Sequence, residues 1–308
     1  MQTRNLRING FDGVVGSEVP LHVYGDSSRG PRVGVMAGVH GCEYVAMAAL
    51  REFLASLDER ELRGELRVVP MANIASFWHR TPFVVPHDQK NLNRLFPGSP
   101  EGTFSERLAF TLFENLIRPC DYFIDMHSGD LVEDLEPFVI VDDSAVGEQS
   151  MMLARQYGLH HIVRVEESAS PIGGTASSAA ARHGIASITA EVGRCGMSEP
   201  GAIARHLSGL RRALSFCGLL PVAGIDGSQV GQVYEHTSWT WVRTPHEGWW
   251  TPAVAVGHFV EEGDVMGEVV SLDSSYRHDV RASRSGYILF MTSSPAVMVD
   301  GLLLGLAS

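Results

Sequence analysis

The sequence predicts an α/β protein with a mixed, largely parallel sheet flanked by helices and a smaller C-terminal domain built only of β-strands. Up to about residue 220, short apolar runs of strand type alternate with segments of helical spacing. From Pro221 to Ser308, short strands and Gly and Pro turns replace this pattern, and no helix is expected. Because its 308 residues exceed one average domain, we expect one domain over 1–220 and a second over 221–308.

Strands and helices are expected to alternate along the first domain. The lead-in to residue 30 is strand-rich, and Arg32 to Ala37 is the first strongly apolar strand. Further strands are expected at 21–24, 66–71, 122–126, 138–141, 162–165 and 185–190. Helices are expected at 44–57, 104–116, 145–157, 175–183 and 202–214. Residues 72–100 hold four prolines and no clear period, and a loop this long inside a compact domain is usually functional.

Composition and charge exclude several classes of partner. The chain is 44% hydrophobic, yet no apolar run approaches the roughly 18 residues needed to span a bilayer, so no membrane partner is expected. A net charge of -12 argues against a nucleic acid or an anionic membrane surface as partner. Met1 to Pro20 lacks the layout of a signal peptide, and the four cysteines show no Cys-x-x-Cys spacing. We therefore expect free thiols and a cytoplasmic protein.

His40 and Glu43 lie where the first buried strand gives way to a helix. The strand ends near Gly38, a tight turn follows, and the three-residue spacing lets both side chains converge on one point. An imidazole and a carboxylate are two of the ligand types that zinc accepts. On its own, a His-x-x-Glu is more often a capped helix start or a surface pair.

Two further polar residues end predicted strands. His127 supplies a third candidate ligand from a distant strand, and two histidines with one carboxylate leave the fourth position on zinc for water. Glu191 is placed to take a proton from that water and to deliver it to a leaving amine. The alternatives are a hydrogen-bonded strand-end histidine and a capping or surface acid. The apolar run before Glu191 favours the cleft.

The long loop carries candidate substrate-binding residues. Asn93 and Arg94 form an amide and guanidinium pair that suits a substrate carboxylate, because the planar fork of arginine matches both oxygens. Arg80 is a second cation of this loop that is able to polarise a carbonyl or hold an oxyanion. On its own, an Asn-Arg pair is usually a surface feature.

In their order and intervals, these motifs resemble the succinylglutamate desuccinylase/aspartoacylase family, part of the wider zinc metallocarboxypeptidase group. The most specific matches are Gly38 to Glu43 and Asn91 to Gly98, and the likeness covers about residues 15–220. The resemblance implies a zinc carboxypeptidase-like α/β fold.

The resemblance also implies an activity and a set of roles. One zinc ion per chain would be held by His40, Glu43 and His127, with Glu191 as the general base and acid. Asn93 and Arg94 would bind the carboxylate of a small anionic N-acyl amino acid, whose amide is hydrolysed to carboxylate and amine. Arg80 matches the family's arginine only approximately, since the interval to Arg94 is longer here.

Residues 257–288 resemble a lipoyl- or biotinyl-type half-barrel. Such carrier domains need an attachment lysine, and the chain has no lysine after Lys90, so a carrier function is excluded. A wall over the active site or a contact in a homo-oligomer is the better use for this domain.

Three rival functions share the same residues. A carboxypeptidase-type peptidase would use the site on peptides, and an esterase would act through an oxygen leaving group. A zinc-binding protein without turnover is the third, and the presence of Glu191 argues against it, because a structural zinc site does not require a base.

Overall fold

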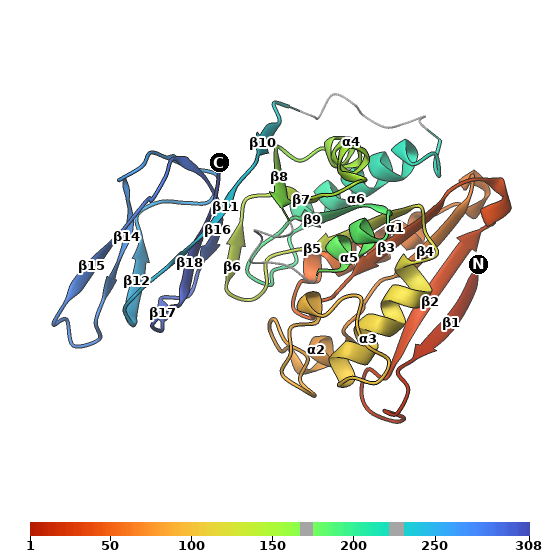
Figure 1. The fold of residues 1–308 in the computed structure, drawn as a ribbon, viewed down its shortest axis with the longest axis horizontal. Coiled ribbons are helices and arrows are strands. Elements are labelled where there is room, and N and C mark those ends of the chain that lie inside the picture. The colour runs from red at the N-terminus through yellow and green to blue at the C-terminus, as the bar shows by residue number, and fades with distance from the viewer. Residues whose placement is uncertain (167–174, 222–230) are drawn as a thin grey trace.

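The computed structural model describes residues 1–166, 175–221 and 231–308 (Figure 1). Its largest element is a nine-stranded mixed sheet with the order β1-β2-β4-β3-β5-β9-β7-β8-β10. In this order the strands are Gln2–Arg7, Glu18–Gly25, Glu65–Val69, Arg32–Ala37, Tyr122–His127, Ala186–Glu191, Phe138–Asp143, His161–Glu166 and Tyr234–His236. Five of the eight strand pairs are parallel, so the predicted fold class is confirmed.

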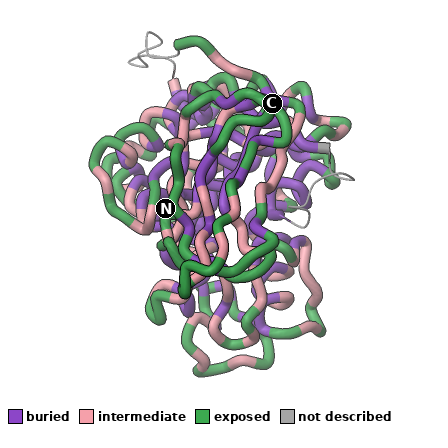
Figure 2. Tube along the Cα trace, turned by 90° about the vertical axis from the view of Figure 1, so that its left-hand side faces the viewer, coloured by how far each residue is buried: buried purple, intermediate pink, exposed green. Residues whose placement is uncertain are grey.

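Helices cover both faces of this sheet. They are α1 (Tyr44–Ser56), α2 (Ile74–His79), α3 (Phe104–Leu112), α4 (Gly147–Tyr157), α5 (Ala176–Arg182) and α6 (Pro200–Phe216). Alternate residues of β3 point to opposite faces, as the strand geometry requires. Val33 and Val35 pack into the core with α1, α4 and α6, whereas Met36 packs into the core with α3 and α5. Buried residues accordingly gather in the interior of the molecule (Figure 2).

The parallel strands β3, β5 and β9 lie side by side and set the position of the polar residues. In their register His127 at the end of β5 is the partner of Glu191 at the end of β9. Ala37, which ends β3, is the partner of Met126. The turn that carries His40 and Glu43 therefore leaves the sheet beside His127, at the edge where α/β proteins place their sites.

The C-terminal part consists of two antiparallel sheets. One contains β11 (Trp239–Arg243), β18 (Leu302–Ala307), β16 (Gly286–Thr292) and β13 (Phe259–Val260), and the other contains β15 (Arg277–Arg281), β14 (Val265–Val270), β12 (Gly248–Pro252) and β17 (Ala296–Val297). A separate apolar cluster that includes Trp250, Met266 and Leu304 fills this part.

The N-terminal and C-terminal parts each contribute one strand to a sheet of the other part. β6 (Glu133–Leu135) pairs with β16, and β10 pairs with β8 in the large sheet. The domain boundary expected after residue 220 stays a prediction, and β6 before it and β10 after it each pair with a strand of the other part. Among the described residues, no helix has the length and apolar character needed to cross a membrane.

Two segments differ from the sequence-based expectation. Residues 72–100 contain the short helix α2, which Asn73 caps through a hydrogen bond from the Ser76 N–H to its Oδ1 (3.1 Å). Six residues are too few for a helical period to be visible. The helix expected at 104–116 is α-helical only to Leu112 and continues as a π-helical turn, Phe113–Ile117.

Candidate active site

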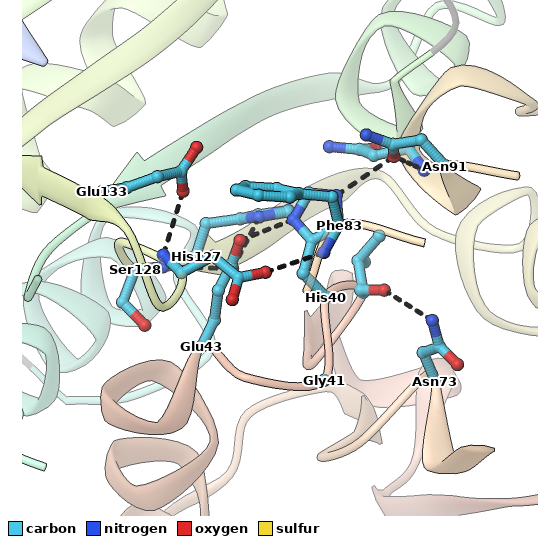
Figure 3. A network of polar contacts seen from close by, with 12 residues as sticks. His40, Gly41, Glu43, Asn73, Phe83, Asn91, His127, Ser128 and Glu133 are labelled. Atoms are coloured by element: carbon cyan, nitrogen blue, oxygen red, sulfur yellow. Dashed lines mark hydrogen bonds and ion pairs between the residues drawn. The ribbon is translucent and has the colours of Figure 1, made fainter. Parts of the chain in front are cut away.

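The turn between β3 and α1 positions His40 and Glu43. Asn73 supports the turn by donating from Nδ2 to the Val39 carbonyl (3.2 Å), and Gly41 donates from its backbone N–H to Ser76 Oγ (3.2 Å). Only glycine fits at position 41, because a Cβ there would lie 2.2 Å from the backbone nitrogen of Phe77 in α2. The turn is therefore held against α2, with Glu43 buried (Figure 3).

His40, Glu43 and His127 converge on one point. Nδ1 of His40 lies 2.5 Å from Oε1 of Glu43, and Nδ1 of His127 lies 2.9 Å from Oε2 of the same carboxylate. One ligand atom from each of the three residues lies within 4.8 Å of the others. Burial favours the neutral acid of Glu43, but the two facing imidazoles outweigh it and lower its pKa to about 2. Such a group of donors is able to hold a divalent metal ion.

The second nitrogen of each imidazole faces another polar side chain. Nε2 of His40 lies 3.1 Å from Oδ1 of Asn91, and Nε2 of His127 lies 3.1 Å from Oδ2 of Asp125. The contact to Asp125 is close but not aligned as a hydrogen bond, so both its oxygens and this Nε2 have no hydrogen-bond partner among the described residues. Contacts of this kind fix the ring orientation of metal-binding histidines.

Glu191 ends β9 and lines the pocket that also contains His40, Glu43 and His127. Burial raises the pKa of Glu191 to about 8; the carboxylates of Glu43 and Glu133 add to the shift, and His127 opposes it. A carboxyl group with a pKa near neutrality is suited to take up and release a proton at neutral pH.

Asn93 and Arg94 enter the pocket from a 3-10 turn, Leu92–Arg94. The side chain of Asn93 is buried, and its Oδ1 accepts a hydrogen bond from the Ala176 N–H at the start of α5 (3.0 Å). Arg94 is more exposed and donates from Nη1 to the Asn93 carbonyl (2.7 Å). A guanidinium at the mouth of a pocket is an anchor for an anionic group.

Residues 29–217 match the family described as the succinylglutamate desuccinylase/aspartoacylase catalytic domain. The chain belongs to the succinylglutamate desuccinylase/aspartoacylase family. The resemblance drawn from the motifs is thereby confirmed.

Individual relatives are similar to this chain over most of its length. It is 29% identical, over 270 residues, to the N-alpha-acetyl-L-2,4-diaminobutyric acid deacetylase of Halomonas elongata, covering 84% of this chain and 77% of that protein. The product-bound ectoine utilization protein EutE (DoeB) from Ruegeria pomeroyi has a TM-score of 0.84 at 25% identity, with 94% of this chain and 89% of that one covered. A succinylglutamate desuccinylase/aspartoacylase from Rhodobacter sphaeroides has the same fold, with a TM-score of 0.83 at 24% identity and the same coverage.

Six of the seven site residues expected from the sequence line the same pocket, and Arg80 is the exception among them. Those six line one pocket of about 840 Å³ with its open mouth included. Arg80 is exposed at the C-cap of α2 with a left-handed backbone (φ +52°), and within the described part of the chain it is not among the lining residues. Arg80 instead ends α2, the short helix that the sequence did not predict.

Other residues of this family member's pocket were not expected. Glu133 on β6 is a half-buried acid whose Oε2 accepts a hydrogen bond from the Asp130 N–H (2.9 Å), and desolvation raises its pKa to about 7. Three aromatic residues of the C-terminal part also line the pocket: Trp239, Trp241 and Phe290. The alternation Trp-Thr-Trp was a signal for two aromatic side chains on one strand face.

Proposed function

We propose that this protein is a zinc-dependent deacylase that hydrolyses the amide of a small N-acyl amino acid to a carboxylate and a free amine. The observation that carries the proposal is the convergence of His40, Glu43 and His127 in the pocket that Glu191 also lines. The deacetylase activity named for the Halomonas elongata relative supports the reaction class.

The donor set fits zinc. Two imidazole nitrogens and one carboxylate are the protein ligands of many catalytic zinc sites, which keep a further position open. Asn91 and Asp125 face the distal nitrogens of the two histidines and would keep their Nδ1 atoms directed at the ion. When bound, zinc lowers the pKa of water to about 7 and polarises a carbonyl group.

Glu191 would handle the proton. As water attacks the acyl carbon, the carboxylate of Glu191 accepts a proton from the water. Glu191 then gives this proton to the amine as the C–N bond breaks. A cation held by the neighbouring residues would lower its raised pKa toward neutrality. The same side chain is then able to serve as base and as acid.

Asn93 and Arg94 would hold the substrate carboxylate at the pocket mouth. Because Asn93 is fixed to the start of α5, the position of the anchor is set by the fold. Arg80 is exposed and is not among the described residues that line the pocket, so the proposal assigns it no step.

The test combines turnover with metal content. With N-acetyl and N-succinyl amino acids, including N-acetyl-2,4-diaminobutyrate, we expect zinc-loaded protein to release the amine. Glu191→Gln should keep one zinc per chain while losing at least about 100-fold in kcat. Unchanged turnover in this variant would remove Glu191 from the mechanism. Faster release from dipeptides or from esters would identify a peptidase or an esterase, and zinc binding without any turnover would identify a binding protein.

A further inference from the structure

A second part of the pocket is apolar and has no role in the proposed hydrolysis. Its lining includes Phe138 and Ile140 of β7, Trp239 and Trp241 of β11, and Phe290 of β16. The metal-ligand group, Glu191, and the Asn93 and Arg94 pair account for the reacting amide and the carboxylate. None of these groups requires a wall of aromatic rings beside it.

The aromatic rings form one connected wall. The ring of Trp239 stacks on Phe138 with centroids 5.4 Å apart and meets Trp241 edge to face at 5.0 Å. Trp241 in turn meets Phe290 edge to face at 5.2 Å. Since the two tryptophans are two residues apart on β11, they share the face that turns toward the pocket.

The neighbouring strand β18 is adapted to this wall. Gly305 is the register partner of Trp241, and a Cβ at Gly305 would lie 2.4 Å from the ring of Trp239. Because Gly305 has no side chain, the indole ring of Trp239 is able to lie over the backbone of β18. With Phe138 and Phe290 buried around it, the wall is a preformed surface.

Three members of the wall keep exposed surface. Ile140, Trp239 and Trp241 are half-buried, so their apolar atoms contact water when no substrate is present. An apolar substrate group would displace this water, and that transfer is favourable in proportion to the area covered. An acetyl group or a short polar side chain would leave most of the exposed surface of these three side chains in contact with water.

The geometry points to a substrate that carries an apolar group, branched or aromatic, packed against Ile140, Trp239 and Trp241. This inference rests on the proposed deacylase function and narrows its substrate class. The apolar group belongs either to the amino-acid side chain or to the acyl chain. Both sources present the same chemistry to the wall.

Two substrate series separate these sources. The first keeps the acetyl group and varies the amino acid from glycine and alanine to leucine and phenylalanine, with diaminobutyrate as a cationic member. The second keeps glycine and varies the acyl group from acetyl to 3-methylbutanoyl and benzoyl. We expect kcat/KM to rise about tenfold or more with apolar size in one series. A best substrate that is the smallest member of each series, or N-acetyl-diaminobutyrate, would overturn the inference.

Variants assign the preference to the wall. Trp241→Ala and the milder Ile140→Thr should reduce kcat/KM for the large apolar substrate about tenfold while leaving N-acetylglycine within a few-fold of wild type. Trp249→Ala, at an exposed tryptophan of β12 outside this pocket, is the matched control and should change neither value. An equal loss for large and small substrates would show that the wall is only structural.

Calorimetric titration of the Glu191→Gln variant makes the inference independent of turnover. Zinc-loaded variant protein is expected to bind the large apolar N-acyl amino acid about tenfold more tightly than N-acetylglycine. If wild type hydrolyses none of the compounds, the proposed function fails while the binding order still decides the inference. If hydrolysis proceeds with no apolar preference in rate or binding, the inference alone fails.

Discussion

Replacing Asn91 with alanine tests how the imidazole of His40 is oriented. The Oδ1 atom of Asn91 accepts from the Asn93 backbone N–H (2.9 Å), which identifies this atom as the amide oxygen, and it lies 3.1 Å from Nε2 of His40. The acceptor therefore selects the tautomer with the proton on Nε2 and leaves the Nδ1 lone pair facing Glu43. Without it, the ring is free to exchange tautomers and to rotate.

The magnitude follows from the two hydrogen bonds that Asn91→Ala removes. Loss of a partner that orients a ligand histidine weakens metal binding about 10- to 100-fold, or about 1.4 to 2.7 kcal/mol. The bond to the Asn93 N–H adds about 1 kcal/mol of lost folding stability. We expect the variant Asn91→Asp, which keeps an acceptor, to recover most of the metal affinity.

Zinc affinity measured by competition with a chelator, together with urea unfolding, checks this reasoning. Asn115→Ala is the matched control, because it removes one hydrogen bond, from Nδ2 to the Thr111 carbonyl (2.9 Å), at a residue that does not line the pocket. It should lose stability without losing zinc affinity. The reasoning is refuted if Asn91→Ala binds zinc as tightly as the control does.

Two further outcomes follow from the structure. Gly41→Ala should destabilise the fold by about 1–3 kcal/mol in urea unfolding and weaken zinc binding, because its Cβ would clash with α2. Gly201→Ala, where a Cβ would have no described residue within 4 Å, is the control, and equal losses in both variants would contradict this explanation. Burial and the facing His236 lower the pKa of His161 to about 4, so its neutral form contributes stability that is complete above pH 6.5 and is lost as the pH falls toward 4. His161→Phe should flatten the decline of the urea midpoint between pH 6.5 and 4.5, and an unchanged slope would show that this histidine is not the titrating group.

The sequence was most informative where function is encoded locally. His40 and Glu43 are three residues apart, and His127 and Glu191 each end a strongly apolar strand, so a parallel sheet was enough to bring them to one edge. The alternation of strand and helix was readable for the same reason, because apolar periodicity reports which face of an element is buried.

Features created by long-range contacts could not be read in this way. The aromatic wall depends on β11 and β16 arriving beside β7, and the entry of Glu133 into the pocket depends on β6 pairing with β16. The place of Arg80 could not be read from the sequence either, because the short helix that ends at it is set by its contacts and its Asn73 cap. No periodicity in six residues reveals that.

The strand β6 connects the sheet that would set substrate preference to the part of the chain that carries the candidate catalytic residues. Its neighbour β16 belongs to the C-terminal sheet, while the metal-binding residues stand on the central strands and the turn after β3. Substitutions on β11 or β16 are therefore free to reshape what the pocket accepts while the reactive groups keep their places. Such a division would let one ancestral hydrolase diversify into enzymes for different metabolites by changing a single β-sheet.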